Sequence, residues 1–159
     1  MRSRALSSQH QRLCWLLEQA KQFSSDQFEL QAHWARYLCV LSAGFLENAL
    51  ADVYSSYARS CANPSVANYV EASLGRIQNP KADRFLQIAR AFNVEWQESL
   101  EHYLSEDGRK DAIDSIMANR HLIAHGKDSG ISLARVADYL GKCVQVIEFI
   151  ESQCGLAEN

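Results

Sequence analysis

Hydrophobic residues recur at helical spacing along nearly the whole chain. An amphipathic helix at about 3–23 is predicted by residues that follow the i, i+3, i+4, i+7 rule: Leu13, Leu16, Leu17, Ala20 and Phe23. A long second helix, capped by Ser25 or Asp26 and ending near Cys61, is predicted by a stripe of Trp34, Leu38, Leu41, Phe45, Ala49, Val53 and Tyr57. No run alternates with the period of two that a strand requires, so the pattern predicts an all-α fold.

Turn signals divide the middle of the chain into shorter helices. Two Asn-Pro pairs, at 63–64 and 79–80, each place an N-cap residue before a proline at the first helical position. They predict helices at about 64–75 and 80–92. A further acidic segment at 94–104 follows them.

The last third of the chain predicts two more helices. The Asp-Gly pair at 107–108 marks a break before a helix at about 109–125, which Gly126 can terminate. Ser132 can cap a final helix. A heptad-like seam on that helix, with alternating steps of three and four, consists of Leu133, Val136, Leu140, Cys143, Ile147 and Ile150. Together the segments predict an up-and-down helical bundle with a four-helix core and short extra helices.

Composition and charge narrow the function classes. The 159 residues are 47% hydrophobic with only 7 Gly and 2 Pro, which indicates one domain, 1–159. A net charge of -3 argues against non-specific polyanion binding, so a nucleic-acid site would have to be a local basic patch. The polar N-terminus does not resemble a secretory signal, and the most apolar stretch, 37–51, is short and broken by Glu47. We therefore expect no membrane partner and a cytoplasmic protein.

The cysteines also predict a cytoplasmic protein. Five of them are scattered along the chain with no CxxC or CxxxH spacing: Cys14, Cys39, Cys61, Cys143 and Cys154. This spacing predicts neither a zinc ribbon nor a disulfide framework. We expect mostly buried core thiols in a reducing cytosol.

Candidate chemistry gathers at 117–127, which contains Arg120, His121, His125 and Lys127. Arg120 occupies a position where the core stripe of its helix calls for an apolar residue, so its guanidinium needs a partner or a function. Its obvious partner is Glu47, a lone charge within a very apolar helix. A purely structural arginine that snorkels or pairs with a buried carboxylate is the alternative.

His125 should lie in the last turn of its helix, where the negative end of the helix dipole favours imidazolium. A histidine that titrates near neutrality suits general acid–base chemistry, although a capping or surface histidine is equally compatible with this position. Five residues at about 100° each leave Arg120 and His125 about 140° apart around the axis. A joint site therefore needs a distorted helix end or a second copy of the motif.

A metal site and a basic patch are the other possibilities at this segment. His121 and His125 are spaced i, i+4, as metal ligands can be, but only Asp128 offers a nearby third ligand and no HExxH pattern is present. We expect no metal and no cofactor. The segment 108–127 has a local charge of +2, which fits a small anionic ligand site better than a nucleic-acid stripe.

The segment Arg120-His121-Leu122-Ile123-Ala124-His125-Gly126 closes an all-α domain with an R-x4-H motif, and it resembles a HEPN domain. The long helix LCVLSAGFLENALADVYSSYA, followed by NRHLIAHGK and ISLARVADYL, is most similar to the RiboL-PSP-type HEPN group. The similarity covers about 27–150, while its one specific motif is six residues long.

The resemblance implies a metal-independent endoribonuclease of prokaryotic defence, toxin–antitoxin or RNA-processing systems, usually a homodimer with the two motifs in one cleft. It implies that His125 acts as general base or acid, Arg120 binds the phosphate and His121 assists. RNA is the implied substrate, and an antitoxin or other defence-system protein is a possible partner. Glu47 as orienter of the arginine and Lys127 as phosphate contact are additions from the residues themselves. The alternative is a non-catalytic helical interaction module that uses the 133–150 seam as its interface.

Overall fold

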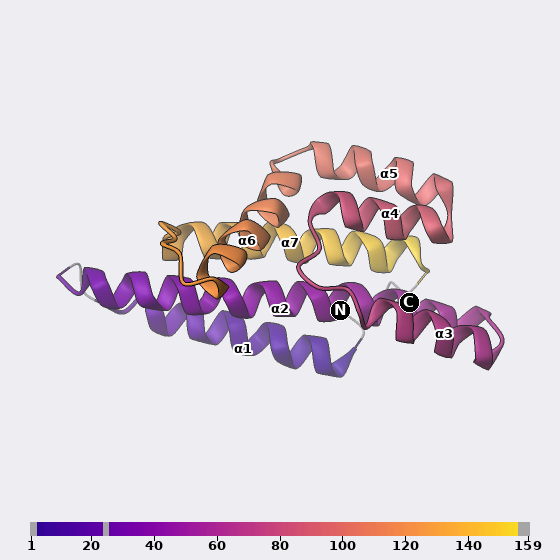
Figure 1. The fold of residues 1–159 in the computed structure, drawn as a ribbon, viewed down its shortest axis with the longest axis horizontal. Coiled ribbons are helices and arrows are strands. Elements are labelled where there is room, and N and C mark those ends of the chain that lie inside the picture. Colours follow the sequence, from indigo (N-terminus) through magenta and orange to yellow (C-terminus); the bar gives the residue numbers. More distant parts are fainter. Residues whose placement is uncertain (1–2, 24–25, 156–159) are drawn as a thin grey trace.

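The computed structural model describes residues 3–23 and 26–155, and within these ranges every regular element is a helix. In chain order they are α1 (Arg4–Ala20), α2 (Phe28–Cys61), α3 (Pro64–Leu74), α4 (Ala82–Phe92), α5 (Val94–Ser105), α6 (Arg109–Ala124) and α7 (Leu133–Gln153) (Figure 1). The predicted all-α class is confirmed. No helix in the described part of the chain is long and apolar enough to cross a bilayer.

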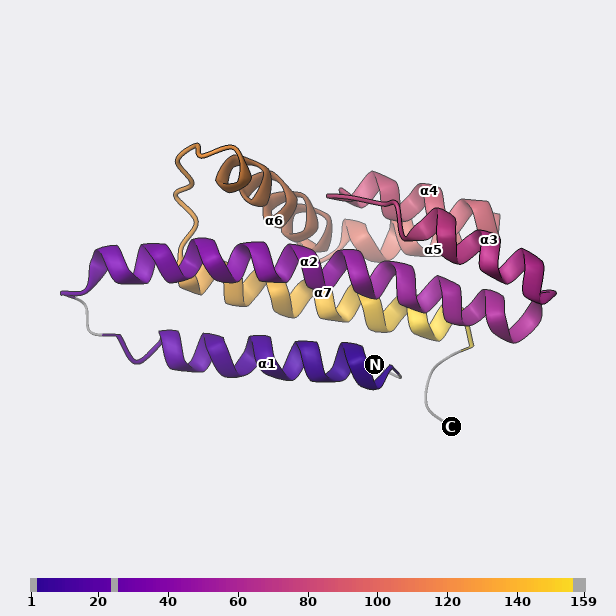
Figure 2. The ribbon, with the colours of Figure 1, turned by 60° about the horizontal axis from the view of Figure 1, so that its bottom comes forward.

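The 34-residue helix α2 is the axis of the bundle and packs against α1, α3, α6 and α7. α1 runs antiparallel to α2 and α7 runs parallel to it, whereas α6 crosses α2 at a steep angle (Figures 1 and 2). The short helices α3, α4 and α5 form the connection between α2 and α6, and α4 and α5 pack on each other. The chain is therefore a helical bundle around α2, with three short helices inserted between α2 and α6. The predicted up-and-down arrangement describes α1 and α2, but α6 crosses the bundle instead of lying along it.

Two of the four predicted helix caps are confirmed. The Asn63 side chain accepts a hydrogen bond from the N–H of Ser65, with Pro64 in the first turn, and the Ser132 side chain accepts one from Arg135. Two predictions are wrong. Ser25 lies outside the described residues, and Gln27 rather than Asp26 is the N-cap of α2.

The second wrong prediction concerns the residue at which α4 begins. Asn79 adopts a left-handed conformation (φ 50°), and its backbone N–H is bound by the carboxylate of Glu47. Residues 79–80 therefore form a turn fixed against α2, and α4 begins only at Ala82, with Lys81 as N-cap. The N–H of Ala82 donates to the carboxylate of Asp114 on α6 at 2.8 Å. The predicted Asn-Pro cap is replaced by two tertiary hydrogen bonds.

The apolar seam of α7 is used inside this chain. Its residues from Val136 to Ile150 are buried against α2 and α6, while Leu133 is half-buried. The seam therefore cannot serve as a partner interface, as the interaction-module alternative required.

The cysteine prediction is correct for three of the five. Cys39, Cys143 and Cys154 are buried, whereas Cys14 and Cys61 are exposed, and all five are free thiols. Burial raises the pKa of the Cys154 thiol to about 12, so this group stays protonated and acts as a small apolar side chain.

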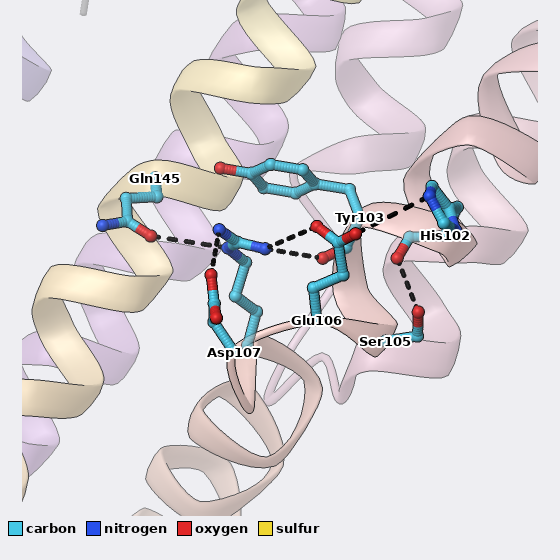
Figure 3. Close-up of polar contacts among 7 residues, drawn as sticks. His102, Tyr103, Ser105, Glu106, Asp107 and Gln145 are labelled. Atoms are coloured by element: carbon cyan, nitrogen blue, oxygen red, sulfur yellow. Dashed lines mark hydrogen bonds and ion pairs between the residues drawn. The ribbon is translucent and has the colours of Figure 1, made fainter.

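Arg109 joins the α5–α6 corner to α7 (Figure 3). It is 8% exposed, and its guanidinium donates to the Asp107 carboxylate at 2.8 Å and the Tyr103 carbonyl at 3.1 Å. The guanidinium carbon lies 4.0 Å from the centroid of the Tyr103 ring, which stacks on Phe149 of α7 at 4.2 Å. The charge of Arg109 is thus compensated within the fold and is not available to a ligand.

Arg109→Ala should lower the free energy of unfolding by about 2 kcal/mol, because a charge-assisted bond and a cation–π contact are lost together. Chemical denaturation followed by circular dichroism measures this. Arg135→Ala, at an exposed position of α7, is the control and should change stability by less than about 0.5 kcal/mol. Equal effects of the two changes would show that the Arg109 contacts do not stabilise the corner.

Candidate active site at the end of α6

The C-terminal end of α6 is fixed by a Schellman motif. Gly126 has a positive φ of 65°, its N–H donates to Ile123 at 3.1 Å, and the N–H of Lys127 donates to Leu122 at 2.9 Å. His125 is the C-cap residue, with φ -97° and ψ 15°. The prediction that Gly126 ends this helix is confirmed. The motif gives the backbone at His125 one defined conformation.

The two histidines of the motif lie together. The ring centroids of His121 and His125 are 4.4 Å apart at an interplanar angle of 59°. Both side chains are exposed, and neither has a hydrogen-bond or ion-pair partner among the described residues. The i, i+4 spacing thus forms a pair of adjacent imidazoles whose ring nitrogens are open to solvent.

Arg120 lies one turn earlier on α6 and is half-buried. Its backbone packs against α2 at Cys39, whose thiol donates to the carbonyl of Ile116 at 3.6 Å. Burial raises the pKa of the Cys39 thiol to about 11, although its hydrogen bond with the Arg120 backbone acts in the opposite direction. In the part of the chain that the structure describes, the Arg120 guanidinium has no hydrogen bond or ion pair. Arg120 lies on the core stripe of α6 as predicted, while its guanidinium has no partner among the described residues.

The predicted pairing of Arg120 with Glu47 is wrong. Glu47 accepts the backbone N–H of Asn79 instead. The reason is the point at which α6 crosses α2, which places the backbone of Arg120 beside Cys39. Eight residues of α2 separate Cys39 from Glu47, which corresponds to about 12 Å along the helix. Glu47 therefore positions the turn before α4 rather than the arginine.

The loop after α6 is tied down mostly by residues that the sequence did not single out. Arg36 of α2 donates to the Asp128 carboxylate at 3.2 Å and to the Ser129 carbonyl at 3.4 Å. The Ser129 hydroxyl, which is buried, donates to the side-chain oxygen of Asn119 at 2.8 Å. Of these residues, the sequence had pointed only to Asp128, as a possible metal ligand. The bonds tie the loop after α6 to both α2 and α6.

Asp128, the one nearby candidate for a third metal ligand, is thus engaged by Arg36. Within the described residues, no three His, Cys, Asp or Glu side chains are grouped so that they could hold a metal ion. A cavity of about 290 Å³ lies between 128–133 and the start of α2, and none of the three motif residues lines it. His121 and His125 are exposed and Arg120 is half-buried, so the motif lies at the surface outside this cavity.

A family model described as RiboL-PSP-HEPN matches residues 11–155. The chain belongs to this HEPN family. Comparisons with curated proteins and with solved structures gave no significant match. Membership supports a nuclease-type domain in general, and the predicted resemblance is confirmed.

The positive charge of the HEPN motif region is more localised than the sequence indicated. Of the cations in 108–127, Arg109 and Lys110 are both paired with carboxylates, at 2.8 Å and 2.7 Å. Arg120 and Lys127 have no such partner among the described residues. The unpaired charge is therefore concentrated at the end of the helix, next to the histidine pair.

Glu47→Ala should lower the free energy of unfolding by about 1.5 kcal/mol, because the N–H of Asn79 loses a charged acceptor in a half-buried turn. Asp52→Ala on the same helix is the matched control, since Asp52 is also half-buried but has no hydrogen bond among the described residues. Thermal unfolding of both variants measures the difference. A Glu47→Ala protein as stable as the control would contradict a positioning role for this carboxylate.

Proposed function

We propose that this HEPN chain is a metal-independent endoribonuclease that acts as a homodimer. One observation carries the proposal: an arginine without an internal partner and two exposed, adjacent imidazoles occupy one fixed helix end. An unpaired guanidinium beside a histidine supplies an anion contact and a proton-transfer group, the two functions that phosphodiester cleavage requires.

In this mechanism, an imidazole of the motif removes the proton from a ribose 2′-OH, and the 2′-oxygen attacks the adjacent phosphorus. The P–O5′ bond breaks, and a protonated imidazole gives its proton to the departing 5′-oxygen. The products are a 2′,3′-cyclic phosphate and a 5′-OH. His125 is the proton-transfer residue, and Arg120 binds the phosphate and stabilises the charge that develops on its oxygens. His121 positions the phosphate, and Lys127 adds a further phosphate contact.

A dimer supplies a second copy of the motif, and with it a second His125. Arg120 and His125 point about 140° apart on a regular helix, so one motif is poorly suited to hold both sides of a phosphate. Beside Cys39, where α6 crosses α2, two large apolar side chains are left open: Tyr37 is 47% and Val40 is 36% exposed. Burying this apolar face against its copy would give a dimer. A dimer that brings the two motifs into one cleft would let one His125 act as base and the other as acid.

The biological role that we propose is cleavage of RNA in prokaryotic defence, a toxin–antitoxin pair or RNA processing, with an antitoxin or other protein as regulator. A non-catalytic interaction module is less well supported. Its proposed surface on α7 is buried in the core of this chain.

RNA cleavage should require the motif. In buffer containing EDTA, the unaltered protein should cleave labelled single-stranded RNA, and Arg120→Ala and His125→Ala should each reduce the rate at least about 100-fold. His102→Ala is the matched control, because His102 is an exposed histidine of α5 that is 80% exposed and far from the motif in sequence. Gel analysis should show 2′,3′-cyclic phosphate ends. Equal cleavage by all four proteins would indicate a contaminant and contradict the assignment.

The dimer should depend on the apolar face of α2. Light scattering should give twice the 17.9 kDa mass of one chain, and Val40→Glu should shift the protein to monomer and reduce RNA cleavage. Val94→Glu, at an exposed valine of α5, should change neither mass nor cleavage. A fully active monomer would contradict a composite site.

A further inference from the structure

A second cationic surface lies where α3 ends and α4 begins. A hollow of about 540 Å³ is lined there by Arg76, Lys81 and Arg84, together with neutral polar side chains such as Ser73, Gln78 and Gln87. We call it the α3–α4 cleft. Its one acidic side chain is Asp83. The cleft therefore carries a formal charge of +2 in a chain whose net charge is -3.

The cations of the cleft have no carboxylate partner, whereas half of the other described Lys and Arg side chains do. Arg84 donates only to the neutral side chain of Gln87 at 3.0 Å, and Arg76 and Lys81 have no polar partner among the described residues. By contrast, ion pairs with carboxylates are formed by Lys21, Arg36, Arg59, Arg109, Lys110 and Lys142.

Asp83 does not neutralise the cleft, because its carboxylate is already bound by Lys110 at 2.7 Å. That hydrogen bond is the main reason why the pKa of Asp83 lies below its usual value. Three exposed cations without carboxylate partners on one concave surface suit the charge of a polyanion.

The cleft is fixed relative to the motif. The turn before Lys81 is held by Glu47 through the N–H of Asn79, and the first residue of α4 is held by Asp114 of α6. Asp114 and His121 are seven residues apart and share one face of α6. The separation along the axis is about 10 Å. Figure 1 shows the loop that leads into α4 passing alongside α6.

We propose that the α3–α4 cleft binds the phosphodiester backbone of single-stranded RNA, on the strand whose cleaved phosphate lies at Arg120 and His125. The inference rests on the proposed ribonuclease function and adds a substrate-binding surface to it. Lys81, Arg84 and Arg76 contact phosphates that are a few nucleotides from the cleaved bond. The cleft thereby gives a chain of net negative charge a local surface that binds anions, without general affinity for polyanions.

The test measures RNA binding by fluorescence anisotropy in the His125→Ala background, where the strand stays intact. Lys81→Gln/Arg84→Gln should weaken binding of a short, labelled single-stranded RNA about tenfold, whatever its sequence. The slope of log K against log salt should fall by about 1.4, since each lost phosphate contact in a single strand contributes about 0.7. Arg4→Gln/Arg12→Gln is the matched control, because both are exposed cations of α1 without a carboxylate partner among the described residues. Since α1 lies across α2 from α4 (Figures 1 and 2), this change should leave affinity and slope unchanged.

The outcomes separate this inference from the proposed function. If the protein with an intact motif cleaves RNA but Lys81→Gln/Arg84→Gln binds RNA as the control does, the cleft assignment is overturned and the ribonuclease stands. If binding depends on Lys81 and Arg84 but cleavage does not depend on His125, the cleft assignment stands and the catalytic proposal fails. Equal melting temperatures of the variants confirm that the substitutions act on binding and not on folding.

Discussion

The arrangement of this molecule depends on the burial of α2 on nearly all sides. Thirteen of its 34 residues are buried, among them Leu38, Phe45 and Tyr54, and they contact α1 on one side and α6 and α7 on the other. Because these contacts are apolar and extend along the whole helix, α2 fixes the positions of elements that are distant in sequence. Both proposed RNA-binding surfaces are positioned by α2. Cys39 contacts the backbone of the motif, and Glu47 binds the turn that precedes the cleft's Lys81.

The end of α6 combines local and tertiary control. The Schellman motif at Gly126 sets the backbone conformation of His125. The packing of the Arg120 backbone against Cys39 sets where the R-x4-H motif lies along α2. The side chains that would carry the chemistry are the ones that this packing leaves without partners.

Elsewhere on the surface, too, some cations are paired with carboxylates and others are not. Arg109 and Lys110 look in the sequence like part of one basic patch with Arg120, yet their contacts with carboxylates make them structural. Lys81 and Arg84, which drew no attention in the sequence, have no carboxylate partner. A net charge of -3 therefore conceals two local cationic surfaces on the same side of α2. What matters for an anionic ligand is which cations remain unpaired.

The sequence by itself determined the helical class, most helix boundaries, the stop at Gly126 and the R-x4-H motif, because periodicity, caps and turn residues act over a few neighbouring residues. It could not determine the partner of Glu47, the burial of the α7 seam or the compensation of Arg109. Each of these depends on which helices pack together and in which register, and so on contacts between residues far apart in the chain. The two histidines were predictable as an i, i+4 pair, but the unpaired state of Arg120 became visible only when α6 was placed on α2.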